Sequence, residues 1–221
     1  MSKKIFTINP MKKTKLMCLV FILLIFTSCS NRIKVACVGD SITEGYGLAW
    51  QSKTSYPVVL DSILGPGYSV LNLGRSATTL RKKGDFPYLS CKEFYDVFAY
   101  RPDIIIIQLG TNDTKSQNWN AGSFYTDYKA LIDTFKTIPT NPKIFVCLPV
   151  PVFKTKWTIN DSTLTSGVIP AVEKIAKKNN LPVIDLYHQM HDQGENFFDG
   201  IHPDEKGAKI MAGIIAEDLK K

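Results

Sequence analysis

The chain has 221 residues, of which 44% are hydrophobic and 21% are charged, and this length and composition suit a single globular α/β domain. The formal net charge is +7, but residues 1–28 hold five of the 27 basic residues and no acidic one, which leaves 22 basic against 20 acidic residues in the remainder. No basic patch with interleaved aromatic residues remains, so the composition gives little support to a nucleic-acid-binding function.

The first 28 residues have the pattern of an export signal. Lysines are followed by eleven apolar residues, Leu16 to Phe26, a run too short for a membrane-spanning helix and typical of the core of a signal peptide. Met11 is a possible true start, because a signal beginning there has ordinary proportions. The following "FTSC" resembles the lipobox of bacterial lipoproteins, with Cys29 as the acylated residue. We therefore expect residues 1–28 to be a signal peptide, 29–221 to be one domain, and the protein to be anchored in a bacterial envelope by lipid or, alternatively, to be soluble in the periplasm or secreted.

Five short, mostly apolar runs alternate with helix-like segments along the rest of the chain. Runs that are apolar on both faces indicate strands of a parallel sheet covered on both sides. Strand–helix alternation predicts βαβ units and hence a three-layer α/β/α sandwich around a five-stranded parallel sheet. The expected strands are 33–39, 68–74, 103–110, 143–150 and 182–186, and the expected helices are 56–64, 123–138, 169–180 and 203–219.

Polar residues follow the first three predicted strands at the edge where open parallel sheets bind ligands. The strand ends read "GDS", "NLGRSATT" and "QLGTND", and a turn alone does not need serine, asparagine and threonine three times over. Ser41 in the first of them is a candidate nucleophile, provided that a histidine can remove its proton.

The chain offers three histidines as the base. His188 and His191 form an HxxH pair without an obvious third ligand, and the remaining cysteines are scattered, so neither a metal site nor a disulfide framework is expected. His202 follows Asp199 in a D-x-x-H turn, where a carboxylate can orient the imidazole. A plain turn and a helix cap explain the same two residues equally well. Other candidate acids are Asp40 and Asp185.

In combination, these segments resemble the SGNH or GDSL hydrolases, whose four sequence blocks occur here in order. The matching residues are Gly39-Asp40-Ser41-Ile42, Gly74 within "NLGRSATT", Gly110-Thr111-Asn112-Asp113, and Asp199 to Pro203. The resemblance implies the flavodoxin-like form of this sandwich. It also implies a serine esterase in which Ser41 attacks an ester, His202 is the base and Asp199 orients it. It also implies an oxyanion hole made by the backbone N–H groups of Ser41 and Gly74 and the side chain of Asn112, with no metal or organic cofactor. Asp113 is expected to be a turn or cap residue.

The sequence favours an O-acetylated carbohydrate, with sialic acid as one possibility, as the substrate. The loops 80–90 and 110–119 resemble those of bacterial carbohydrate O-acetylesterases of this family. Tyr46, Trp50 and Trp119 are expected near the site, where aromatic faces can stack on a sugar, and Lys115, together with Arg81, Lys82 and Lys83, could meet an acidic sugar. A lipid or short-chain acylhydrolase is the alternative. A glycan-binding lipoprotein without catalysis is a third hypothesis, which the intact set of four site residues disfavours.

Overall fold

The computed structural model describes residues 32–221, so the predicted signal peptide, Met11 and Cys29 lie outside the described residues. Its strands are β1 (Ile33–Gly39), β2 (Tyr68–Gly74), β3 (Ile104–Gln108), β4 (Lys143–Leu148) and β5 (Val183–Asp185). Its helices are α2 (Ser41–Glu44), α3 (Gln51–Thr54), α4 (Tyr56–Leu64), α5 (Lys92–Tyr100), α6 (Ala121–Phe135), α7 (Asp161–Thr163), α8 (Ile169–Asn179), α9 (Leu186–Gln189) and α10 (Glu205–Leu219).

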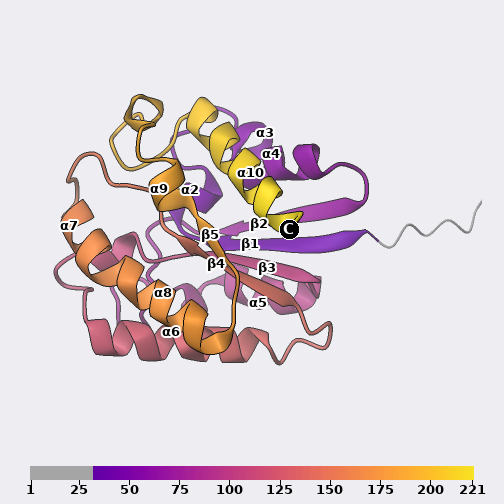
Figure 1. Ribbon diagram of the computed structural model, residues 1–221, viewed down its shortest axis with the longest axis horizontal. Coiled ribbons are helices and arrows are strands. Elements are labelled where there is room, and N and C mark those ends of the chain that lie inside the picture. The colour runs from indigo at the N-terminus through magenta and orange to yellow at the C-terminus, as the bar shows by residue number, and fades with distance from the viewer. Residues whose placement is uncertain (1–31) are drawn as a thin grey trace, which may run out of the picture. The chain divides into compact units, whose positions relative to one another are not determined.

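All five strands pair in parallel in the order β2-β1-β3-β4-β5, which confirms the predicted sheet (Figure 1). The bounds of β1, β2 and α4 are those expected from the sequence, whereas β3, β4 and β5 are shorter than expected at one or both ends. Helix α5 was not expected from the sequence, and its aromatic residues are spread over several faces of the helix. The fold is a three-layer α/β/α sandwich.

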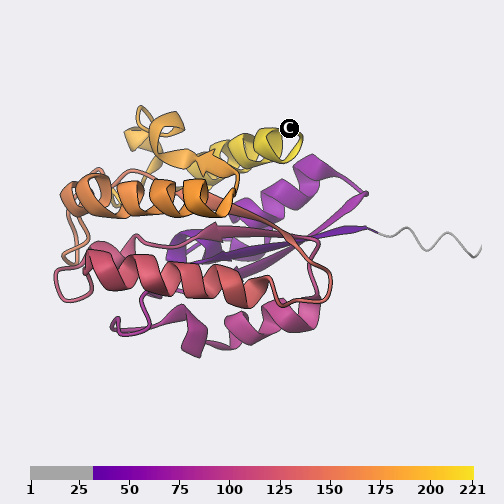
Figure 2. The same ribbon diagram turned by 60° about the horizontal axis from the view of Figure 1, so that its bottom comes forward.

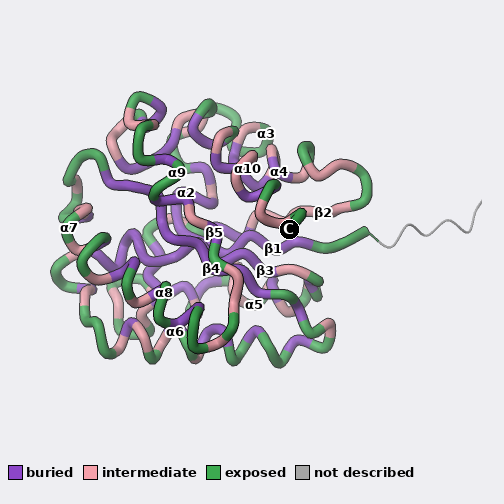
Figure 3. Tube along the Cα trace, in the orientation of Figure 1, coloured by how far each residue is buried: buried purple, intermediate pink, exposed green. Residues whose placement is uncertain are grey.

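Successive residues of β1 point to opposite faces of the sheet and enter two separate cores. Val35 and Cys37 pack with α4 and α10, whereas Ala36 and Val38 pack with α5, α6 and α8. All four side chains are fully buried, as expected for a central strand covered on both sides. Figure 2 shows the sheet between these helix layers, and Figure 3 shows the buried strands inside a shell of exposed helix surface.

The strand order places a topological switch point between β1 and β3, because the chain adds β2 on one side of β1 and β3 on the other. Crevices at such points, outside the carboxyl ends of the strands, are the usual ligand sites of open α/β sheets. The segments after β1 and β3 carry Ser41 and Asn112, so the fold brings these two residues to one crevice. Over residues 32–221, no helix is long and apolar enough to cross a membrane.

Candidate active site

Ser41 is held at the end of β1 by a tight strand-to-helix turn. The Asp40 side chain caps α2 by accepting a hydrogen bond from the Ile42 N–H at 3.0 Å, and Ser41 is the first residue of that helix. Gly39 is required by this turn, since a Cβ there would lie 1.9 Å from Thr43 Oγ1. The glycine, the aspartate and the serine that end the strand therefore have separate roles in packing, capping and exposing a hydroxyl group to the crevice.

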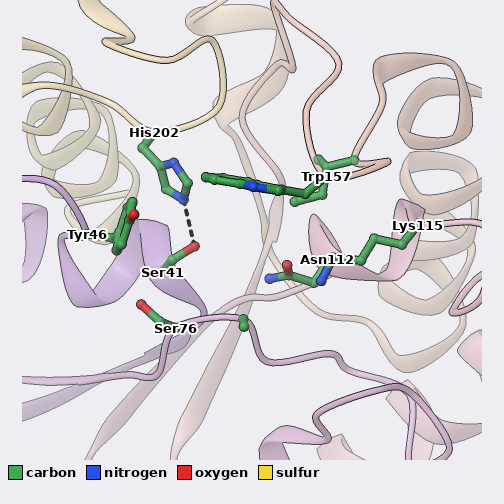
Figure 4. Close-up of a pocket in the computed structure, with 9 residues that line it drawn as sticks. Ser41, Tyr46, Ser76, Asn112, Lys115, Trp157 and His202 are labelled. Atoms are coloured by element: carbon green, nitrogen blue, oxygen red, sulfur yellow. Dashed lines mark hydrogen bonds between the residues drawn. The ribbon is translucent and has the colours of Figure 1, made fainter.

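The hydroxyl of Ser41 meets the imidazole of His202, 161 residues further along the chain. Ser41 Oγ and His202 Nε2 are 2.9 Å apart, and His202 Nδ1 lies 3.0 Å from Asp199 Oδ2 (Figure 4 shows the Ser41–His202 contact). Because a carboxylate only accepts, Nδ1 carries the proton, which leaves Nε2 free to accept from Ser41. The structure thus brings together the three residues predicted to form the catalytic chain.

Asp199 is fixed by its own turn. Its Oδ1 accepts hydrogen bonds from the backbone N–H groups of Ile201 at 3.0 Å and His202 at 2.8 Å, which leaves Oδ2 for the imidazole. Gly200 has a φ of +84°, and a Cβ there would lie 2.4 Å from Lys154 Cβ. The D-x-x-H spacing therefore works through a glycine turn packed closely against the segment after β4.

Two aromatic rings hold the His202 imidazole. The Phe198 ring stacks on it with an interplanar angle of 19° and a centroid distance of 5.8 Å, and the Tyr46 ring lies 4.8 Å away in a tilted orientation. His202 itself is 3% exposed. This packing restricts the imidazole to the orientation in which Nε2 faces Ser41.

The electrostatics of the pair suit a base that is neutral near pH 7. Burial alone would raise the pKa of Asp199, but the hydrogen bonds from the backbone and ring of His202 outweigh it and lower the pKa to about 2. Burial lowers the pKa of His202; the hydrogen bond and charge of Asp199 oppose this shift only in part, and the positive charge of Lys156 adds to it. Asp199 is thus ionised and His202 uncharged at neutral pH, as a general base requires.

Lys156 is a third charged group at the site, and the sequence analysis missed it. Its Nζ lies 3.3 Å from Asp199 Oδ2, the same oxygen that accepts from His202. Its charge therefore stabilises the carboxylate and disfavours a second positive charge on the imidazole. The ion pair is partly exposed, with the Lys156 side chain 40% accessible, so we expect its effect in the titration of His202 more than in folding stability.

We expect Lys156→Met to move the acid limb of the kcat/KM–pH profile to higher pH. The variant loses a charge that lowers the pKa of His202, so the imidazole becomes protonated, and inactive as a base, at a higher pH than in the wild type. The measurement is the kcat/KM–pH profile for an acetyl ester, with Lys154→Met as the control for loss of a nearby lysine. An unchanged limb, or one at lower pH, would contradict this role for Lys156.

Of the three residues predicted to supply oxyanion donors, Ser41 and Asn112 line the cavity and Gly74 does not. Asn112 lines it, and its Nδ2 donates one hydrogen to Thr78 O at 3.1 Å, leaving the second for a ligand. Gly74 does not line this cavity, and its N–H already donates to Asn72 Oδ1 at 2.9 Å. The need for glycine at 74 has another cause, since a Cβ there would lie 2.2 Å from the backbone nitrogen of Glu44.

Ala77 takes the position expected of Gly74. It lines the cavity, has a left-handed φ of 66°, and its N–H makes no backbone hydrogen bond within the described part of the chain. Sequence reasoning chose the glycine nearest the strand end, whereas the chain turns into the cavity three residues later. The positive φ of a non-glycine residue has no signal in the sequence.

Two further buried carboxyl groups support the site from behind. Burial raises the pKa of Asp40 to about 7. The hydrogen bond from Ile42 lowers this pKa, and the charge of Asp113 raises it further. Burial likewise raises the pKa of Asp113 to about 6, although its oxygens accept the backbone N–H groups of Leu80 and Arg81 at 2.8 and 2.9 Å. Asp113 therefore joins the loop that follows Ala77 to the end of β3, a structural role wider than the predicted cap.

The remaining histidines and their neighbours form no second site. Asp185, a candidate acid, caps α9 and contacts His188 Nδ1 at 2.9 Å rather than His202. Among residues 32–221, no cluster of three or more histidine, cysteine or acidic side chains could hold a metal ion.

The cavity beside Ser41 has a volume of about 350 Å³, near the lower end of small-molecule sites. Of the predicted substrate-binding residues, Tyr46 and Lys115 line it, although Lys115 is also paired with Asp85 at 3.3 Å. Trp50 and Trp119 do not line it. Its walls are Ser41, Tyr46, Ser76, Ala77, Asn112, Lys115, Trp157, Ile159 and His202 (Figure 4).

The two misplaced tryptophans have other surroundings. Trp50 is 63% exposed with Lys53 Nζ over its ring, and Trp119 packs against Phe124 at a centroid distance of 5.4 Å and against Gly167. The cavity instead contains Trp157, from the segment after β4. The signal available in the sequence was the place of this segment, which directly follows the carboxyl end of a predicted strand.

A serine, a histidine and an aspartate linked by hydrogen bonds at the carboxyl edge of an α/β sheet are the arrangement found in serine hydrolases. Comparison of the sequence with protein families agrees: the model of the GDSL-like lipase/acylhydrolase family matches residues 37–210. The chain therefore belongs to this family.

Individual relatives include carbohydrate-active esterases. The chain is 43% identical over 209 residues to an acetylxylan esterase of Xylanibacter ruminicola, covering 86% of this chain and 44% of that protein. It is 23% identical to the cellulase/esterase CelE of Acetivibrio thermocellus, covering 85% of this chain and 25% of that protein. The chain thus spans less than half the length of these curated relatives.

Solved structures share the fold. The aryl esterase of M. smegmatis has a TM-score of 0.68 at 21% identity and covers 85% of this chain and 98% of its own. The acetyl xylan esterase AlAXEase has a TM-score of 0.67 at 21% identity, and the match covers 85% of this chain and 100% of that chain. At this level of identity the likeness confirms the α/β architecture.

Proposed function

We propose that the protein removes acetyl groups from hydroxyls of carbohydrates, with acetylated xylan-type saccharides as the substrate class. The observation that carries the proposal is the Ser41–His202–Asp199 chain opening into a small, partly aromatic cavity. The 43% identity to an acetylxylan esterase supports the choice of acyl group and sugar. An acidic sugar such as sialic acid has less support, because the cavity lysine Lys115 is paired with Asp85.

The geometry accommodates a two-step acyl transfer. Ser41 Oγ attacks the acetyl carbonyl carbon while His202 Nε2 accepts the hydroxyl proton, giving a tetrahedral oxyanion. The oxyanion is placed to accept hydrogen bonds from the N–H groups of Ser41 and Ala77 and from Asn112 Nδ2. Nε2 then returns the proton to the leaving sugar oxygen, which breaks the ester bond and leaves an acetyl group on Ser41. A water molecule then attacks the acetyl carbonyl while Nε2 accepts its proton. Nε2 passes this proton to Ser41 Oγ as the bond from Oγ to the acetyl carbon breaks, which releases acetate and restores the serine.

The electrostatic role of the donors follows from their fixed positions. Asn112 is 3% exposed and held by its bond to Thr78 O, so its free N–H does not have to reorganise when negative charge develops. One such donor typically contributes about 10²–10³ in rate. Asp199 stays ionised throughout and stabilises the imidazolium that forms after attack.

The proposal is tested with the full-length protein and a series of p-nitrophenyl esters from acetate to palmitate, beside acetylated xylo-oligosaccharides and O-acetylated sialic acid. We expect kcat/KM to be highest for acetyl esters and to fall with chain length, because the cavity is small. We also expect acetate release from the xylo-oligosaccharides. An increase of kcat/KM with acyl length would contradict the proposal and favour a lipid acylhydrolase. Cleavage of acetylated sialic acid but not of xylo-oligosaccharides would correct the sugar.

A further inference from the structure

The cavity wall contains a strained turn that folding alone does not explain. Lys156 and Ile159 form an isolated antiparallel pair, with N–H···O distances of 3.3 and 2.9 Å, around Trp157 and Thr158. Trp157 has a φ of 52° and Thr158 a φ of 64°. Two successive left-handed residues are typical of a type I′ turn, which favours asparagine and glycine. A tryptophan followed by a β-branched threonine is among the least favourable choices for it.

The turn is held in this conformation from both sides. Asn160 Nδ2 donates to Thr158 O at 3.0 Å and to Thr114 O at 3.1 Å, which ties the turn to the end of β3. On the other side, Lys156 Nζ binds Asp199 Oδ2. Ile159 is 4% exposed and belongs to the core beside α6 and α8. Unfavourable backbone conformations that surrounding contacts maintain are concentrated at functional sites.

The indole of Trp157 gains little for the fold from its position. It is 52% exposed and belongs to neither buried core of the described domain. One face is close to Lys156, whose Nζ is 4.1 Å from the ring centroid. The rest of the ring borders the cavity, and Figure 4 shows it nearly edge-on, reaching from the turn toward His202.

The distance to His202 places Trp157 beside the leaving group. The centroids of the two rings are 6.1 Å apart. The leaving oxygen must come within hydrogen-bond reach of His202 Nε2 to receive its proton, so the sugar that carries this oxygen is next to the indole. The acetyl methyl group lies beyond the carbonyl carbon, away from that oxygen.

From these contacts we infer that Trp157 is the platform on which the sugar ring bearing the acetyl ester stacks, and that it determines specificity for the alcohol half of the substrate. The inference rests on the proposed function for the identity of the sugar. An indole suits this role because it offers a wide apolar face with only two rotatable side-chain bonds to fix. The strained, tethered turn sets the ring in place before the substrate arrives, which lowers the ordering cost of binding.

The test compares a saccharide with an ester that has no ring. The full-length wild type, Trp157→Asn and Trp157→Phe are assayed with an acetylated xylo-oligosaccharide and with ethyl acetate. Asparagine tolerates the left-handed backbone and removes the indole, whereas phenylalanine keeps a smaller ring. For Trp157→Asn we expect KM for the saccharide to rise about tenfold, and kcat/KM for the saccharide to fall several times further than kcat/KM for ethyl acetate. The KM of Trp157→Phe for the saccharide should lie between those of the wild type and Trp157→Asn. The control Tyr95→Ala, which removes an exposed ring on α5, should have the KM of the wild type.

The results distinguish a failure of the role of Trp157 from a failure of the proposed function. Equal losses on both esters in Trp157→Asn, or an unchanged KM for the saccharide, would overturn the role of Trp157 while leaving the proposed function intact. A wild type that cleaves ethyl acetate but no acetylated saccharide would overturn the proposed function itself. If Trp157→Asn does not fold, as judged by its thermal unfolding, the KM ratio of Trp157→Phe decides. Quenching of tryptophan fluorescence by xylo-oligosaccharide in Ser41→Ala, lost in Ser41→Ala/Trp157→Phe, is the expected direct sign of binding, and persistence of that quenching would contradict the inference.

Discussion

Replacing Ser41 with alanine is expected to lower kcat for acetyl ester cleavage by at least about 10⁴-fold. The variant lacks the oxygen that forms the bond to the acetyl group, and the cavity offers no other hydroxyl in contact with His202 Nε2. The donors at Ala77 and Asn112 stay in place, so a small residual rate over the uncatalysed reaction should persist. The measurement is steady-state acetate release from an acetylated xylo-oligosaccharide.

A second serine in the same cavity provides the matched comparison. Ser76 donates both its N–H and its hydroxyl to the carboxylate of Glu44. The hydroxyl of Ser76 is therefore bonded to Glu44 and not to His202, the base of the catalytic chain. We expect Ser76→Ala to lose far less activity than Ser41→Ala. Mass spectrometry of the wild type quenched during turnover should detect an acetyl group on Ser41. A Ser41→Ala variant within tenfold of the wild type would refute Ser41 as the nucleophile.

Asp199→Asn is expected to reduce kcat by about 10⁴-fold, with little effect on folding. The amide oxygen can still accept the backbone N–H groups of Ile201 and His202, so the turn is preserved. The amide NH₂, however, would face His202 Nδ1 as a donor and move the ring proton to Nε2. That nitrogen then cannot accept the proton of Ser41, and Lys156 loses the carboxylate it pairs with.

The chain contains a matched control for this substitution. Asp185 and His188 are also three residues apart and in contact at 2.9 Å, but they are exposed and away from Ser41. We expect Asp185→Asn to keep kcat within about twofold. Because the pKa of Asp199 is about 2, the wild-type profile should show no titration of this group between pH 5 and 9, a range set by the assay. Equal effects of the two substitutions would contradict the assignment of Asp199.

The sheet and the Asp199–His202 turn were predictable because they are encoded locally, whereas the pairing of Ser41 with His202 was expected only from the resemblance to the hydrolase family. Apolar β-branched runs identify strands wherever both faces are buried, and the D-x-x-H turn is formed within four residues, so its geometry follows from sequence spacing. The position of α5 depends on tertiary contacts, because this nine-residue helix packs on β1 and β2. Propensity alone underestimates such a helix.

The places of Ala77 as an oxyanion donor and of Trp157 in the cavity wall were not predictable from local sequence. Gly74 was chosen for its lack of a side chain, yet the cavity receives Ala77, because the left-handed φ of that residue turns the loop inward. Trp50 and Trp119 were chosen by their closeness in sequence to the motifs. Trp157 reaches the cavity through the order of β3 and β4 in the sheet and an unusual turn, and neither is visible in a single residue pattern.

The separation of 161 residues between Ser41 and His202 has a consequence for the maturation of the protein. The segments that carry Ser41 and His202 are separated by most of the domain, and contacts between such distant segments form slowly in folding. Until the segment that carries His202 docks, Ser41 is an ordinary alcohol without a base. The proposed esterase activity therefore reports the docking of this segment, and a chain in which His202 has not reached Ser41 would lack the catalytic base.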